Sequence, residues 1–163
     1  MSTGRIWRTV STSSSDTEQL GQLLGRQLTG GEVLELRADL GGGKTTFVRG
    51  LAAGAASQDR VASPTFTLNR IYKAPKFDIH HYDFYRLNEP GIVADQLAES
   101  LDNPRAVTVV EWSDIVQDVL PPEHLIIEFK PTPAASDERE VAVTYPEALA
   151  PLVEKLENDW SSR

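Results

Sequence analysis

The sequence predicts an α/β fold in which helices flank a mixed central sheet, with parallel strands in the core and antiparallel strands at the edges. Residues 106–110 form a short apolar run that is typical of a strand buried in a parallel sheet. A glycine-rich loop at residues 38–46 is followed by apolar residues at helical spacing. Residues 125–129 and 139–145 read as strands around a proline-rich polar loop, which indicates an antiparallel hairpin at the sheet edge.

We expect a helix and then a strand before the glycine-rich loop. Four leucines share one helical face: Leu20, Leu23, Leu24 and Leu28. Ser15 and Glu18 have the spacing of a capping box at the start of this helix. Two glycines end it, and residues 32–37 then read as a strand. We expect residues 1–14, which are rich in serine, to be peripheral or poorly ordered.

The later part of the chain continues the alternation of strands and helices. Residues 77–85 read as a strand in which every second residue shares a face. A weak helical pattern follows between residues 92 and 101. The chain closes with a helix whose apolar residues are Leu149, Leu152, Val153 and Leu156. These elements fit a single sheet with helices on its faces.

The glycine-rich loop has the chemistry of a phosphate-binding loop. Gly41, Gly42 and Gly43 can adopt positive φ angles, so successive backbone N–H groups can turn inward around phosphate oxygens. The first turn of the next helix adds unpaired N–H groups and a partial positive charge. Because this loop joins a strand to a helix, the fold is predicted to be a sandwich of the P-loop NTPase kind.

The residues that end the loop predict a nucleotide and a magnesium ion. Lys44 is expected to reach the β- and γ-phosphates, and the Thr45 hydroxyl to ligate Mg²⁺. Ala38 stands where the usual pattern has its first glycine. The alternative is a tight turn with an incidental lysine. The strand before the loop and the helix after it disfavour that alternative.

Two acidic residues are candidates for the chemistry at the phosphates. Glu111 ends the apolar strand, where phosphate-loop enzymes place a carboxylate for Mg²⁺, although it also fits an ordinary charged residue leaving the core. Asp83 is expected either to ligate the metal, to orient or deprotonate a water molecule, or to make a structural hydrogen bond. His80 and His81 point to opposite faces of their strand, so we do not expect them to form a metal pair.

Other side chains near the expected site have more than one interpretation. Trp112 either covers part of the nucleotide site or packs beside the strand end. Arg49, Arg86 and Arg139 are each able to neutralise charge in a transition state, and the sequence does not choose among them.

Length, composition and charge narrow the class of protein. The chain has 163 residues and 40% hydrophobic content, so we expect one domain over residues 1–163 with a substantial core. The absence of cysteine excludes disulfides and thiolate metal sites. Sixteen basic and 24 acidic residues give a net charge of −8, which opposes autonomous nucleic-acid binding. No apolar run is long enough for a membrane span, so we expect a cytoplasmic protein without a membrane partner.

Three further blocks, taken together with the phosphate loop, make the chain resemble a known family. They are Ser-Pro-Thr-Phe-Thr-Leu at residues 63–68, His-x-Asp-x-Tyr-Arg-Leu at residues 81–87, and Glu-Trp at residues 111–112. With these blocks the chain resembles the bacterial tRNA threonylcarbamoyladenosine biosynthesis ATPases, the TsaE family, over roughly residues 17–145.

The resemblance implies a cytoplasmic ATPase that uses ATP and Mg²⁺. Such a protein assists a partner enzyme that transfers threonylcarbamoyl to the adenosine beside the tRNA anticodon. The implied partners are proteins of the TsaD and TsaB types, with tRNA involved only indirectly or through these partners. Hydrolysis is hypothesised to reset the partner complex between turnovers.

The resemblance also implies roles for individual residues. The loop from Gly41 to Thr46 would hold the phosphates, and Thr45 and Glu111 would serve Mg²⁺. Asp83 would be required for hydrolysis, so the implied catalytic residues are Lys44, Asp83 and Glu111. Thr17 and Arg139 resemble nucleotide contacts, and residues 63–68 resemble a switch-like loop.

Two other classes of phosphate-loop protein are alternatives. A small-molecule kinase would share the loop but usually has an arginine-rich lid, for which the sequence offers no candidate. A GTP-dependent switch protein would carry an Asn-Lys-x-Asp block, which is absent from the sequence.

Overall fold

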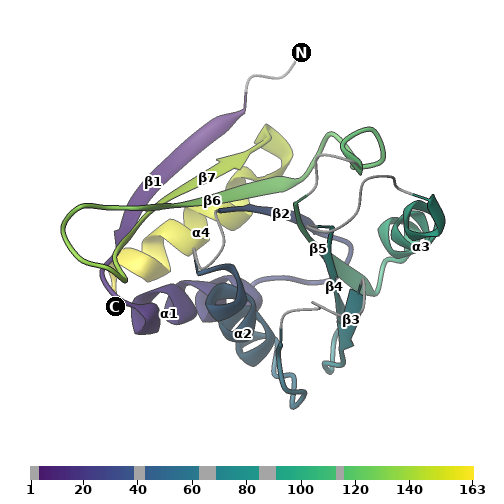
Figure 1. Ribbon diagram of the computed structural model, residues 1–163, viewed down its shortest axis with the longest axis horizontal. Helices are drawn as coiled ribbons and strands as arrows, with labels where there is room; N and C mark the ends of the chain where they lie inside the picture. Colours follow the sequence, from purple (N-terminus) through teal and green to yellow (C-terminus); the bar gives the residue numbers. More distant parts are fainter. Residues whose placement is uncertain (1–3, 39–42, 63–68, 85–90, 113–115) are drawn as a thin grey trace.

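The computed structural model describes residues 4–38, 43–62, 69–84, 91–112 and 116–163. Within these residues, seven strands form one sheet in the order β1-β7-β6-β2-β5-β4-β3 (Figure 1). The strands are β1 (Arg5–Ser11), β2 (Val33–Arg37), β3 (Asn69–Tyr72), β4 (Asp78–Asp83), β5 (Ala106–Glu111), β6 (Leu125–Pro131) and β7 (Arg139–Tyr145). The helices are α1 (Ser14–Gly25), α2 (Lys44–Gly54), α3 (Gly91–Asp102) and α4 (Ala150–Ser161), and a short 3₁₀ turn, η2 (Glu147–Leu149), precedes α4.

The sheet is parallel at its centre and antiparallel at both sides. Strands β6, β2, β5 and β4 run parallel, whereas β7 and β1 on one side and β3 on the other are antiparallel to their neighbours. This arrangement confirms the predicted α/β fold with a mixed sheet. The β6–β7 hairpin is also present, but it lies one strand inside the edge because β1 pairs with β7.

The N-terminal segment lies at the edge of the sheet and is ordered there. Of residues 1–14, which we expected to be peripheral or poorly ordered, residues 5–11 form the edge strand β1. Alternate residues of β1 anchor it to the helices. The Trp160 Nε1–H of α4 donates to Thr9 Oγ1 at 2.8 Å, and the buried Ser11 hydroxyl lies 2.6 Å from the Thr17 hydroxyl.

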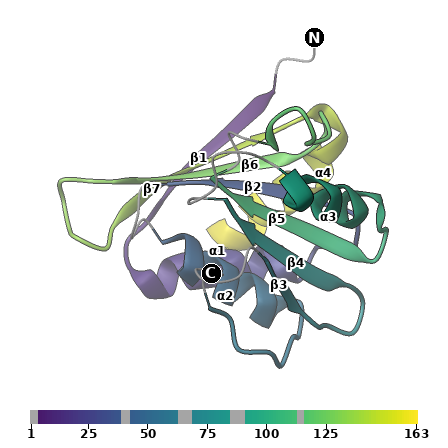
Figure 2. The same cartoon turned by 45° about the vertical axis from the view of Figure 1, so that its right-hand side comes forward.

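Each face of the sheet is covered by its own helices. Helices α1 and α2 lie side by side on one face, and α3 lies on the other, above β5 and β4 (Figures 1 and 2). Strand alternation divides the core in the same way, since Leu34 and Leu36 of β2 join the α1/α2 cluster and Val33 joins the α3 cluster. Helix α4 packs against the α1/α2 cluster through Val153 and Leu156.

Helices α1 and α2 touch through their backbones. A Cβ atom added at Gly50 of α2 would lie 1.9 Å from the Glu18 carbonyl oxygen of α1. A Cβ atom at Gly21 of α1 would lie 2.2 Å from the Phe47 carbonyl oxygen of α2. Only glycine allows this approach, which fixes the axis of α2 and therefore the position of its first turn.

Two local features differ from the expectation. The N-cap of α1 is Ser13, whose hydroxyl accepts from Asp16 N at 3.1 Å, so the expected capping box beginning at Ser15 is wrong. Strand β3 was not predicted, because Asn69–Tyr72 is short and its Ile71 side chain is 44% exposed. No helix in the described ranges is long and apolar enough to cross a membrane.

Candidate functional site

The candidate site lies at the carboxyl edge of the parallel strands, where α2 begins. Strand β2 ends at Arg37, and α2 starts at Lys44 after its N-cap residue Gly43. Gly43 has a φ of 103°, which a side chain would strain, and it offers no side chain to cap the helix. The N–H groups of the first turn are therefore able to donate hydrogen bonds to an anion, which would take the place of a capping side chain. Gly41 and Gly42 lie outside the described residues.

Lys44 is buried and directed toward groups at this edge. Its side chain is only 7% exposed, and Nζ donates to the Ala38 carbonyl oxygen at 3.1 Å. The same Nζ lies 3.6 Å from Glu111 Oε1 and 4.2 Å from the centroid of the Trp112 ring. The ammonium group thus has carbonyl, carboxylate and aromatic neighbours in a site of low water content, where an anion would be attracted strongly.

Glu111 is held by a chain of hydrogen bonds that starts on the neighbouring strand. Its buried carboxylate accepts from His81 Nε2, and His81 Nδ1 lies 3.2 Å from the Tyr72 hydroxyl. Tyr72 in turn donates to the Ala62 carbonyl oxygen at 2.8 Å. Burial raises the pKa of the Tyr72 hydroxyl, which keeps it protonated as a donor. The chain connects Glu111 to the segment that precedes residue 63.

Asp83 lies beside Glu111 at the end of the adjacent strand. The two residues are partners in the parallel β4–β5 register, and Phe84 N donates to the Glu111 carbonyl oxygen at 3.1 Å. Asp83 is partly buried. Asp83 and Glu111 therefore end neighbouring strands at the same edge of the sheet as the α2 N-terminus.

The donor set fits a nucleotide-bound Mg²⁺ better than a metal held by protein alone. Within the part of the chain that the structure describes, no group of three or more His, Cys, Asp or Glu side chains is placed to hold a metal ion. Thr45 lies in the first turn of α2, and Glu111 at the end of β5 offers a carboxylate. Mg²⁺ keeps few protein ligands when phosphate oxygens complete its coordination, so the residues present fit ATP with Mg²⁺.

The remaining predicted nucleotide contacts lie at the same edge. The Thr17 methyl group would be 3.7 Å from a Cβ atom at Gly43, so α1 begins directly beside the loop. Arg139 starts β7 opposite Ser11 of β1, and its Nη1 donates to the Ser136 and Glu138 carbonyl oxygens at 2.7 and 2.8 Å. The Thr17 hydroxyl is bonded to Ser11. Nucleotide contact by Thr17 and Arg139 stays a prediction.

The structure places three more side chains at the site, of which only Tyr72 was not considered from the sequence. His81 and Tyr72 orient Glu111 through hydrogen bonds. From the sequence, strand alternation indicated only that His81 shares a face with Asp83. Trp112 has a φ of 55°, an uncommon conformation for a bulky residue, and this turn places its ring beside Lys44. The adjacency of β3, β4 and β5 in the sheet brings Tyr72, His81 and Glu111 together.

A second buried carboxylate belongs to Glu35 of β2, whose side chain lies on the face of the sheet opposite to α1 and α2. Glu35 Oε1 accepts from His124 Nε2 at 3.1 Å and from Gln117 Nε2 at 3.3 Å, and Oε2 accepts from Arg37. Burial raises the pKa of Glu35, but the hydrogen bonds from His124 and Arg37 outweigh it and bring the pKa to about 2. The Glu35 carboxylate raises the pKa of His124. This network braces the strand that leads into the loop.

Comparisons with known proteins agree with this architecture. The family model described as threonylcarbamoyl adenosine biosynthesis protein TsaE matches residues 11–141. A TsaE protein of Bacillus subtilis is 36% identical over 138 residues, which cover 85% of this chain and 84% of the relative. A TsaE protein of Treponema pallidum is 40% identical over 114 residues, covering 70% and 84%.

A solved structure shows the same fold over the whole chain. The crystal structure of Bacillus subtilis YdiB superposes with a TM-score of 0.78 at 28% identity, covering 98% of this chain and 99% of that chain. The family model and the relatives each span most of the sequence, including the α2 N-terminus and the ends of β4 and β5. The chain therefore belongs to the TsaE family of threonylcarbamoyl adenosine biosynthesis proteins.

Proposed function

We propose that this chain binds ATP with Mg²⁺ and hydrolyses it in support of tRNA threonylcarbamoyladenosine biosynthesis. In this proposal it acts on a partner complex of the TsaD and TsaB types and allows repeated turnover at the adenosine beside the anticodon. The names of its relatives supply the pathway. The site geometry supports the nucleotide chemistry, and the net charge of −8 favours contact with tRNA through the partners.

The observation that carries the proposal is the buried Lys44 at the uncapped start of α2. Its ammonium group is 7% exposed, is held 3.6 Å from the Glu111 carboxylate and lies at the start of a helix whose N-cap offers no side-chain hydrogen bond, so it is placed to bind an anion there. Residues 43–46 present N–H groups to the same point, so phosphate oxygens would replace the Ala38 carbonyl as the acceptor for Lys44. Bound Mg²⁺ would neutralise charge on the phosphates.

In this proposal the carboxylates of Glu111 and Asp83 have different roles. Glu111, oriented by His81, would serve Mg²⁺ together with the Thr45 hydroxyl. Asp83, one strand away and partly exposed, would orient or deprotonate the attacking water molecule, or else complete the metal site. Thr17 and Arg139 would contact the nucleotide from α1 and β7.

The first test measures ATP binding and hydrolysis by the chain with its partner complex. Lys44→Ala should abolish productive nucleotide use, because it removes the cation at the β- and γ-phosphates. Lys155→Ala, which removes an exposed lysine from α4, is the matched control and should behave as the unmodified chain. Hydrolysis that persists in Lys44→Ala would refute the site.

The second test separates the proposed role from that of a small-molecule kinase. Multiple-turnover threonylcarbamoylation of tRNA is measured with ATP and the TsaD and TsaB type proteins. The unmodified chain should sustain turnover, and Lys44→Ala should behave like no addition. If all three reactions behave alike although the chain binds ATP, the auxiliary role is wrong, and phosphorylated small-molecule products should be sought.

A further inference from the structure

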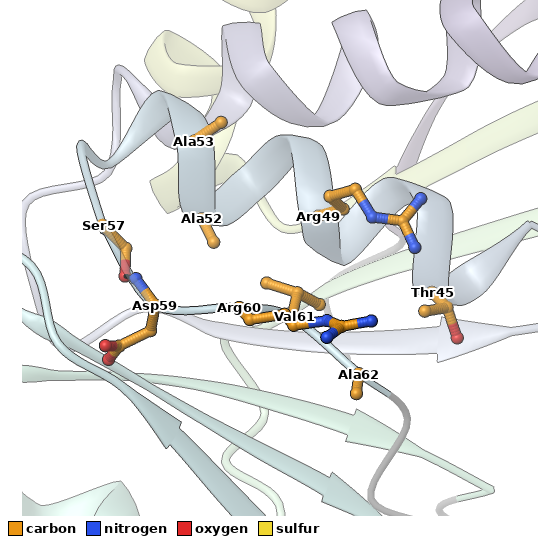
Figure 3. Close-up of a pocket in the computed structure, with 9 residues that line it drawn as sticks. All are labelled: Thr45, Arg49, Ala52, Ala53, Ser57, Asp59, Arg60, Val61 and Ala62. Atoms are coloured by element: carbon orange, nitrogen blue, oxygen red, sulfur yellow. Dashed lines mark hydrogen bonds between the residues drawn. The ribbon is translucent and has the colours of Figure 1, made fainter.

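A pocket of about 520 Å³ lies between α2 and the segment at residues 57–62 (Figure 3). One end of the pocket is formed by Thr45, the residue that follows Lys44 in the first turn of α2. The opposite end is formed by residues 57–59, after α2 has ended. Its lining residues are Thr45, Arg49, Ala52, Ala53, Ser57, Asp59, Arg60, Val61 and Ala62. The pocket therefore continues outward from the candidate nucleotide site.

Two guanidinium groups converge on the Thr45 end of this pocket. Arg49 extends from α2 and Arg60 from the facing segment, and Figure 3 shows both side chains directed toward Thr45. Arg49 follows Thr45 by four residues, so the two lie on the same face of α2. The arrangement places two positive charges and one hydroxyl group around a shared space.

The acidic residue of the pocket does not neutralise these arginines. Asp59 lies at the far end, with its carboxylate turned away from both guanidinium groups in Figure 3. Its Oδ2 accepts from the Lys73 backbone N–H at 2.6 Å, so the carboxylate is already bonded to the chain. Across the five described ranges, no carboxylate forms an ion pair with Arg49 or Arg60.

The other residues that line the pocket have no negative charge that could offset the two positive charges. Ala52, Ala53 and Val61 contribute small apolar side chains. Two cations that face one pocket repel each other unless an anion lies between them. Guanidinium groups bind tetrahedral oxyanions through paired N–H donors, and a hydroxyl group adds one more donor. The chemistry of the pocket therefore matches a phosphate group.

We propose that this pocket binds a phosphate group through Arg49 and Arg60, next to Thr45. The inference rests on the proposed function for the source of that group, which is either the terminal phosphate of bound ATP or the inorganic phosphate released from it. In both cases Arg49 and Arg60 would act on the side of the nucleotide that changes during hydrolysis. Of the three arginines that the sequence left open, Arg49 lines this pocket, whereas Arg86 lies outside the described residues.

Binding of inorganic phosphate tests the pocket apart from the loop. Phosphate is titrated into the full chain carrying Lys44→Ala, which weakens the loop site, and binding is followed by phosphorus NMR. Adding Arg49→Gln or Arg60→Gln should weaken binding about tenfold or more, because each change removes a charge-assisted contact. Adding Arg26→Gln, which changes an exposed arginine after α1, should have no effect. Equal thermal unfolding temperatures confirm that the variants fold.

A second arm distinguishes the two sources of phosphate. The affinities for ADP and a non-hydrolysable ATP analogue are measured in the otherwise unmodified chain and in its Arg49→Gln, Arg60→Gln and Arg26→Gln variants. Contact with the terminal phosphate predicts about a tenfold loss for the ATP analogue alone. A loss of inorganic phosphate binding with both nucleotide affinities unchanged identifies the released phosphate as the ligand.

The proposal is overturned if Arg49→Gln and Arg60→Gln match Arg26→Gln in both arms. Failure of the proposed function has a different signature: the chain would bind neither nucleotide, while inorganic phosphate binding would still depend on Arg49 and Arg60. That result would support the pocket as a phosphate site and remove the ATPase role.

Discussion

The close contact between α1 and α2 predicts a large effect of adding one methyl group. In Gly50→Ala, the new Cβ atom would lie 1.9 Å from the Glu18 carbonyl oxygen, whereas real Cβ atoms essentially never come within 3.0 Å of another group. The helices would have to separate by at least 1.1 Å, the difference between these two distances. The obstacle is backbone, which cannot rotate away as a side chain does, so the packing of both helices must change.

The expected cost follows from two opposing effects. Alanine stabilises a helix interior by about 1 kcal/mol relative to glycine. Overpacking of this kind costs up to about 3 kcal/mol, which leaves a net loss of about 2 kcal/mol in the free energy of unfolding. For a chain of this length that loss lowers Tm by about 4 to 8 °C. Because α2 begins at Lys44, its displacement should also weaken nucleotide binding.

Thermal unfolding followed by circular dichroism measures the first effect, and titration with ADP the second. Ala98→Gly on α3 is the control. It changes an exposed helical position away from the candidate site and the pocket, so it should cost about 1 kcal/mol through helix propensity without altering nucleotide affinity. A higher Tm for Gly50→Ala than for the unmodified chain would refute the reasoning, because propensity would then outweigh the contact.

Two further predictions concern the buried carboxylates. His81→Ala should lower the free energy of unfolding by about 1 to 3 kcal/mol and slow ATP hydrolysis, because the Glu111 carboxylate loses its buried hydrogen-bond donor. If neither the free energy of unfolding nor the rate of hydrolysis changes, His81 does not have this role. The Glu35–His124 pair should stabilise the fold most between about pH 4.5 and 6.5. Its contribution is lost as pH falls toward the Glu35 pKa of about 2 and as pH rises through the raised pKa of His124. In urea unfolding, His124→Gln should flatten the decrease in stability that begins as pH rises above about 6.5, and an unchanged slope would exclude the pair as its source.

Several elements could be predicted from the sequence because their signals are local. The glycine run with Lys44 and Thr45 depends on neighbours along the chain, as do the apolar strand that ends at Glu111 and the leucine face of α1. Strand β1 and the Glu35 network could not be predicted in this way. The edge strand depends on pairing with β7, more than 120 residues later, and Glu35 is satisfied by His124 from a distant segment. Such long-range pairings leave no fixed spacing in the sequence.

The sequence by itself determined the α/β class, and it predicted a phosphate-binding loop with the candidate residues Lys44, Asp83 and Glu111, because backbone propensity and side-chain type are properties of short segments. Only the tertiary structure decided how these residues meet. The order of the strands places β4 beside β5 and so joins His81 to Glu111. The packing of α2 against the segment at residues 57–62 brings Arg49 to face Arg60. Which strands and segments become neighbours depends on burial over the whole chain, and this is why contacts across the sheet and the pocket appear only in the folded molecule.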